Sequence, residues 1–128
     1  MVDSQLADKF VDIYRQISQK GDVFLFAMVK MDELSDKWSI IISAPWIDLA
    51  KKSETFDYVR GLMKQKLNTE ELLNVARIGI FGPTSPLVSI ITSAIRVDSG
   101  SSRLQNTRIN GYLINDAYIF KSISPQIK

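Results

Sequence analysis

The chain has 128 residues, of which 45% are hydrophobic and 23% charged, so it can bury one core and is too apolar for a disordered protein. It contains no cysteine and no histidine, which excludes disulfides, thiolate nucleophiles, metal centres built on Cys or His, and Ser–His–Asp catalysis. Sixteen basic and fourteen acidic residues give a net charge of +2, which is too small to require a polyanionic partner.

The composition also indicates where such a protein resides. A chain without thiols suits a reducing compartment, and Asp3, Asp8 and Asp12 interrupt the amino-terminal segment where a secretory signal would be apolar. The longest apolar run, Val23 to Val29, is far shorter than the roughly 20 residues of a membrane-spanning helix. We therefore expect a soluble, cytoplasmic protein without a membrane partner.

The first predicted element is an amphipathic helix near the amino terminus. Leu6, Phe10, Ile13 and Ile17 recur at helical spacing and line one face, while charged residues occupy the others. Gly21 can adopt the left-handed conformation that ends a helix. This segment has the clearest periodicity in the chain.

Two strands are predicted next, over Val23–Met31 and Lys37–Ala44, because both are rich in β-branched and aromatic residues. The polar stretch 32–36 is short enough to join them as an antiparallel hairpin. Its three carboxylates could face a hard cation, but they lack the spacing of an EF-hand. The pattern therefore favours a solvated loop and no metal site. The loop carboxylates are Asp32, Glu33 and Asp36.

A second helix and two further strands follow. Phe56, Val59 and Leu67 belong to the apolar stripe of the helix, after Pro45 has ended the preceding strand. Residues 74–81 predict a third strand, which the Gly82–Pro86 segment ends. Residues 87–97, rich in Val and Ile, predict a fourth. The glycines near position 80 lack the spacing of a phosphate-binding loop, and no cofactor is expected.

The last part of the chain predicts a loop and one more strand region. Residues 98–107 contain the small polar run Asp98–Ser102, which indicates a mobile loop. Asn110 and Gly111 favour a tight turn before a strand over Tyr112–Lys121. The Asn115–Asp116 pair leaves open whether this region is one strand or a hairpin.

These elements predict a single α+β domain spanning residues 1–128. Its sheet has about five antiparallel strands packed by two helices, in the order α-β-β-α-β-β-β. That order is compatible with a profilin-like or roadblock-like arrangement, which is an analogy of topology without a shared motif.

Two groups of side chains are candidates for binding. Trp46 follows a proline at the end of a strand, where a partly exposed indole could anchor an interface. Basic residues gather on the second helix, where Arg60 and Lys64 share a face, and two arginines flank the 98–107 loop. Acidic neighbours dilute the helical strip. The candidates for anion contacts are Lys51, Lys52, Lys64, Arg103 and Arg108.

The sequence therefore favours a non-catalytic adaptor or regulatory module that binds another protein or an identical chain through a sheet edge, a helix face or Trp46. The abundance of large apolar residues supports this interpretation, because we expect them to exceed what a small core can bury. A nucleic-acid-binding accessory protein is the alternative, and a small enzyme that uses neither His nor Cys is the third. The apolar residues in question are Phe24, Phe26, Ile40, Ile42, Ile90, Ile91 and Phe120.

Overall fold

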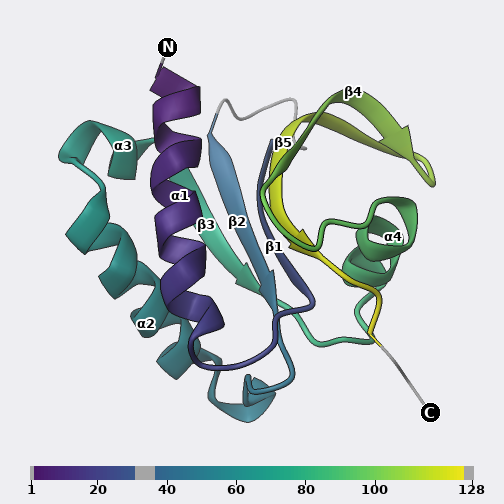
Figure 1. The fold of residues 1–128 in the computed structure, drawn as a ribbon, viewed down its shortest axis with the longest axis horizontal. Helices are drawn as coiled ribbons and strands as arrows, with labels where there is room; N and C mark the ends of the chain where they lie inside the picture. The colour runs from purple at the N-terminus through teal and green to yellow at the C-terminus, as the bar shows by residue number, and fades with distance from the viewer. Residues whose placement is uncertain (1, 31–36, 126–128) are drawn as a thin grey trace.

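A computed structural model describes residues 2–30 and 37–125, and the described part forms four α-helices, one 3₁₀-helix and a five-stranded sheet (Figure 1). The predicted α+β class and the strand number are confirmed, but the prediction of two helices is wrong, because the described part contains four α-helices. In chain order the elements are α1 (Val2–Ser18), β1 (Leu25–Lys30), β2 (Trp38–Ser43), η1 (Leu49–Lys51), α2 (Lys52–Lys66), α3 (Thr69–Leu73), β3 (Val75–Ile80), α4 (Pro86–Ala94), β4 (Ser102–Ile109) and β5 (Tyr112–Ser122).

The sheet separates two apolar cores because side chains alternate between the faces of each strand. On one face, Phe26 of β1 and Ile40 of β2 pack with the buried stripe of α1 and with α2. On the other face, Ala27 and Ile41 pack with α4 and with the β4–β5 hairpin. Figure 1 shows this arrangement, with α1, α2 and α3 on one side of the sheet and α4 on the other. The predicted apolar face of α1 is confirmed. In the predicted stripe of α2, Val59 is buried and Phe56 is partly buried, whereas Leu67 is buried just after the end of the helix.

The sheet is mixed, so the prediction of a purely antiparallel sheet is wrong. The strand order is β3-β2-β1-β5-β4, and β3 runs parallel to β2 while the other neighbouring pairs are antiparallel. The crossover through α2 and α3 returns the chain to the sheet edge in its original direction, as a helical connection between parallel strands does.

The strand predicted over residues 87–97 is wrong, because Pro86–Ala94 forms helix α4. Its Val and Ile content is typical of a strand, but Val88, Ile91 and Thr92 are buried at helical spacing. Pro86 occupies the first turn, where its missing N–H costs nothing. Burial of one helical face against the sheet overrides the local β preference. The predicted element order is therefore wrong at this position.

The β4–β5 hairpin answers the question that the sequence left open, since Tyr112–Ser122 is one strand. Asn110 and Gly111 have φ values of 49° and 84°, which suit the predicted tight turn between antiparallel strands. Residues 102–107, expected in a loop, belong to β4 and pair with β5. Only residues 98–101 of that expected loop lie outside the strand.

The expectation that many large apolar residues stay outside the core is wrong. Most of the residues that suggested it are buried in the two cores, and Phe24 and Ile90 are partly buried. The large apolar side chains that are exposed in the described part are Leu49, Leu73 and Tyr112. The predicted 32–36 loop and its carboxylates lie outside the described residues. No helix in the described part has the length and apolarity needed to cross a membrane.

Candidate functional site

Strand β3 forms an edge of the sheet. Strand β2 lies on one side of it, and no described strand lies on the other. The amide of Phe81 donates to the carbonyl of Ile42 on β2 at 3.0 Å. Because N–H directions alternate along a strand, the backbone groups of Ile78 and Ile80 point away from β2. The outer side of β3 thus presents backbone groups that an additional strand can pair with.

The opposite edge, β4, is less suited to pairing. Its exposed residues include Arg103 and Arg108, and charged side chains on an edge oppose the approach of another strand. Asn106, in the middle of β4, has φ 49°, which departs from extended geometry. Strand β3 has a single charged residue, Arg77, and its other residues are uncharged and mostly apolar. The β3 edge is therefore the more open of the two.

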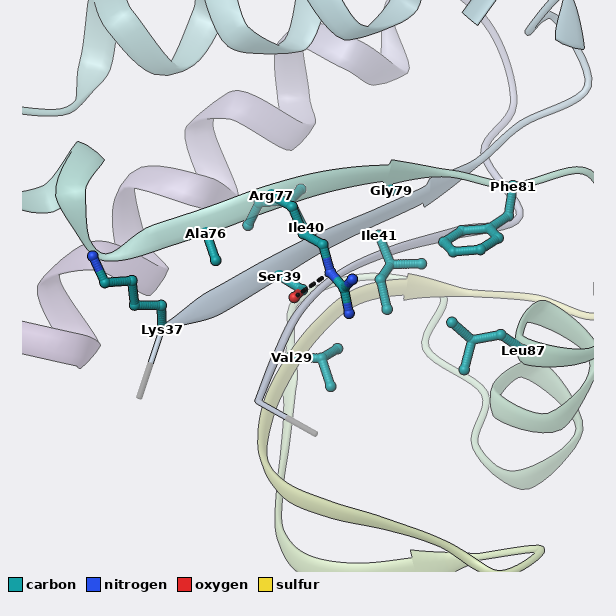
Figure 2. Close-up of a pocket in the computed structure, with 10 residues that line it drawn as sticks. All are labelled: Val29, Lys37, Ser39, Ile40, Ile41, Ala76, Arg77, Gly79, Phe81 and Leu87. Carbon is teal, nitrogen blue, oxygen red and sulfur yellow. Dashed lines mark hydrogen bonds between the residues drawn. The ribbon is translucent and has the colours of Figure 1, made fainter. Parts of the chain in front are cut away.

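A cavity of about 410 Å³, the α4 pocket, lies beside β3 on the face that carries α4 (Figure 2). Val29 and Ile41 form its apolar floor, and Phe81 and Leu87 close one end. Its lining consists of Val29, Lys37, Ser39, Ile40, Ile41, Ala76, Arg77, Gly79, Phe81 and Leu87.

Two cationic residues, Arg77 and Lys37, line the α4 pocket. Arg77 extends from β3 across β2, and its Nε donates to Oγ of Ser39 at 3.2 Å (Figure 2). Lys37 stands at the other end of the pocket, where its Nζ donates to the carbonyl of Leu73 at 2.8 Å. This carbonyl lies just before β3, so the contact ties the start of β2 to the start of β3.

A second hollow of about 390 Å³, the α2 groove, lies between α2 and β3 on the opposite face of the sheet. Its apolar residues belong to the α1–α2 core, and Ala76 and Arg77 line both this groove and the α4 pocket. Strand β3 thus has a hollow on each side. The groove is lined by Phe56, Arg60, Met63, Lys64, Leu72, Val75, Ala76, Arg77 and Ile78.

The two hollows have the same sign of charge. Their ionisable lining residues are Lys37, Arg60, Lys64 and Arg77, and no carboxylate belongs to either lining in the described chain. Arg60, Lys64 and Arg77 are exposed, and none of the three forms an ion pair with a described residue. The edge is therefore bordered by basic side chains over apolar floors.

A buried carboxylate on α3, the helix that precedes β3, joins this helix to α1. Glu71 is 4% exposed, and its Oε1 accepts from Nζ of Lys9 on α1 at 2.7 Å. The same oxygen accepts from the amide of Asn68, whose side chain in turn accepts from the amide of Glu71. Burial raises the pKa of Glu71, but the Lys9 and Asn68 hydrogen bonds and the Lys9 charge outweigh it, so the pKa lies below its ordinary value.

The predicted anion-contact residues do not form one surface. Lys51, Lys52 and Lys64 are exposed around α2, on the side of the sheet that α1 covers. Arg103 makes two hydrogen bonds, 2.9 and 3.1 Å long, to Asp116 on the β4–β5 hairpin. Nη1 of Arg108 donates to the carbonyl of Gly111 at 3.3 Å. Of the predicted set, only Lys64 borders the candidate site.

Trp46, the predicted interface anchor, is partly buried rather than prominent. Its ring packs against the α1–α2 core, and Nζ of Lys20 lies 5.7 Å from its centroid and 4.7 Å from that of Tyr58. The indole Nε1 is buried without a hydrogen-bond partner in the described chain. The residue lines neither hollow, and its role in an interface stays a prediction.

The packing of Trp46 predicts a penalty for a side chain at Gly21. This glycine has φ +147°, and an added Cβ would lie 2.9 Å from Cδ1 of Trp46. We expect Gly21→Ala to lower the free energy of unfolding by about 1.5 kcal/mol, measured by chemical denaturation. Gly61→Ala is the control, because an added Cβ meets nothing within 4 Å inside α2 and alanine favours the helix. A stabilising Gly21→Ala would contradict the packing described.

The sequence did not single out Arg77, and it gave no local signal for it. A lone arginine in an apolar strand normally marks a solvent-facing position. Its significance comes from the edge position of β3 and from the two hollows that meet there, both of which depend on strand order. Arg60 and Lys64 were recognised as a shared helical face, but not as neighbours of β3.

No family model matches the chain, and no curated protein or solved structure shows significant similarity to it. The profilin-like or roadblock-like topology therefore stays a prediction. Function is inferred from the β3 edge and its surroundings.

Proposed function

We propose that the chain is a non-catalytic protein-binding module that receives an extended segment of a partner as an additional strand on β3. The open β3 edge between two hollows carries this proposal. In strand addition, backbone hydrogen bonds supply affinity and side-chain pockets supply specificity. The absence of thiols is compatible with the expected cytoplasmic location.

The positions of the hollows support this mode of binding. Successive side chains of an added strand point to opposite faces of the sheet. One set would therefore meet the α4 pocket and the other the α2 groove. Leu73, which is 64% exposed just before β3, offers further apolar contact at the start of the edge.

The test is a selection of random peptides of about ten residues, displayed against the immobilised full-length chain. Ile78→Pro removes an outward-facing N–H, whereas Ile78→Val keeps it and most of the side chain. We expect selected peptides to bind Ile78→Pro about tenfold more weakly than the parent chain and to bind Ile78→Val almost as well. Circular dichroism establishes that each variant is folded.

A second variant and a second measurement do not depend on proline. Ala76 is exposed and lines both hollows, so Ala76→Trp fills the binding space without altering the core. Bound peptide should also slow hydrogen exchange at the amides of Ile78 and Ile80. Failure to select any binder, or binders unaffected by Ile78→Pro and Ala76→Trp, would overturn strand addition at β3.

A further inference from the structure

We infer that the segment bound at β3 is acidic, with carboxylates on both faces of the added strand. This inference rests on the proposed function and specifies its partner. Arg77 borders the α4 pocket, and Arg60 and Lys64 border the α2 groove. The bound strand would thus meet positive charge on each of its two faces.

The charges are available to a partner because of their surroundings. Arg60 and Lys64 lie one helical turn apart on α2 and have no carboxylate partner in the described part of the chain. Arg77 hydrogen-bonds only the neutral hydroxyl of Ser39 among the described side chains, so its charge is not compensated. By contrast, Arg103 on the other sheet edge is already paired with Asp116. Uncompensated positive charge is thus found at β3.

The apolar floors of the two hollows indicate which other residues the bound segment contains beside its carboxylates. Val29 and Ile41 lie beneath Arg77, and Phe56 and Ile78 lie beside Arg60 and Lys64. A side chain that enters either hollow can bury aliphatic surface on this floor while a carboxylate at the rim meets a cation. An acidic segment that also contains apolar residues satisfies both features.

A second copy of this chain fits the edge less well. Pairing two β3 strands about a two-fold axis would place the same basic border on both sides of the junction. Like charges that face one another across paired strands are destabilising. A nucleic acid would satisfy the charge, but it cannot supply the backbone groups that pair with a strand edge. The combination of open edge and basic border therefore favours an acidic peptide.

The composition of the selected peptides gives the first test. We expect Asp and Glu to exceed Lys and Arg among binders that depend on the Ile78 amide. The affinity of one such synthetic peptide is then measured by fluorescence anisotropy at about 50 and 500 mM salt, and it should fall at the higher concentration because salt screens exposed charges.

Charge-removing variants give the second test. We expect Arg77→Gln to weaken binding of the acidic peptide about threefold, and the double variant Arg60→Gln/Lys64→Gln about tenfold. A neutral peptide, in which each Glu is replaced by Gln and each Asp by Asn, should bind all these variants and the parent chain equally. The control is Lys52→Gln, which removes the same charge from α2 outside both hollows and should change affinity less than twofold.

The outcomes separate the two proposals. If the acidic peptide and its neutral counterpart bind with the same affinity and both require the Ile78 amide, strand addition stands and the acidic partner is refuted. If no peptide binds, or none depends on Ile78, both are refuted. A random single-stranded oligonucleotide is the remaining comparison. If it binds more tightly than the peptide and binds more weakly once Arg60, Lys64 and Arg77 are replaced, these residues bind phosphates and the acidic peptide is likewise refuted.

Discussion

Replacing Phe10 with alanine is expected to lower the free energy of unfolding by about 4 kcal/mol, one of the two largest effects we predict. Phe10 is fully buried on α1, and its ring centroid lies 6.3 Å from those of Phe26 and Phe120. The substitution removes the contacts of this ring with Phe26 on β1 and Phe120 on β5, and it leaves a cavity that neighbouring side chains fill only in part. Denaturant titration with linear extrapolation measures the change.

The control for Phe10→Ala is Tyr112→Ala. Tyr112 is also aromatic, but it is 47% exposed at the start of β5. Its loss should cost less than about 1 kcal/mol, because an exposed side chain leaves no cavity. A cost below about 1.5 kcal/mol for Phe10→Ala would show that α1 is not packed on the sheet as described.

Replacing Glu71 with glutamine is expected to lower the free energy of unfolding by about 2 kcal/mol at pH 7. The neutral amide loses the ion pair with Lys9 and accepts the Asn68 N–H less strongly than the carboxylate does. Because the Lys9 side chain is 37% exposed, solvent screens the pair, and the expected cost is less than that of breaking a fully buried one.

The pH dependence of this difference follows from the lowered pKa of Glu71 in the folded state. Below the ordinary Glu pKa of about 4.3, the unfolded chain binds a proton at this carboxylate that the folded chain does not yet bind. The free energy of unfolding therefore decreases as the pH is lowered. The loss is complete once the pH has passed through the lower folded-state pKa. We therefore expect the difference in the free energy of unfolding between the parent chain and Glu71→Gln to have its full value above about pH 4.3 and to decrease below it.

Glu70→Gln is the matched control for Glu71→Gln. It removes the neighbouring carboxylate from the same first turn of α3, but Glu70 is exposed. We expect it to cost less than about 1 kcal/mol at pH 7. Equal effects of the two substitutions would assign the stabilisation to the helix terminus in general, instead of the Lys9–Glu71 contact.

The Glu71 contact also bears on the candidate site. It joins α1 to α3, and α3 leads directly into β3. A weakened contact should loosen the start of the edge strand before it affects the far end of the sheet. Peptide binding by Glu71→Gln therefore needs to be compared with its stability when the β3 proposal is tested.

Much of the fold was predictable where one segment determines its own structure. The spacing of Leu6, Phe10, Ile13 and Ile17 specified the buried face of α1, and Asn110–Gly111 specified the turn before β5. The candidate site was much less predictable. Only Lys64 among the predicted binding residues borders it, because the site joins α2 to a strand whose place in the sheet is not encoded locally.

By itself, the sequence determined the α+β class, the absence of His and Cys chemistry, the buried face of the first helix and the positions of the first two strands, because composition and periodicity are local properties. The tertiary structure decided that residues 86–94 form a helix, that β3 pairs in parallel at an edge, and that Arg77 lies near Arg60 and Lys64. These outcomes depend on which surfaces pack together across long separations in the chain, and packing energy there exceeds local conformational preference.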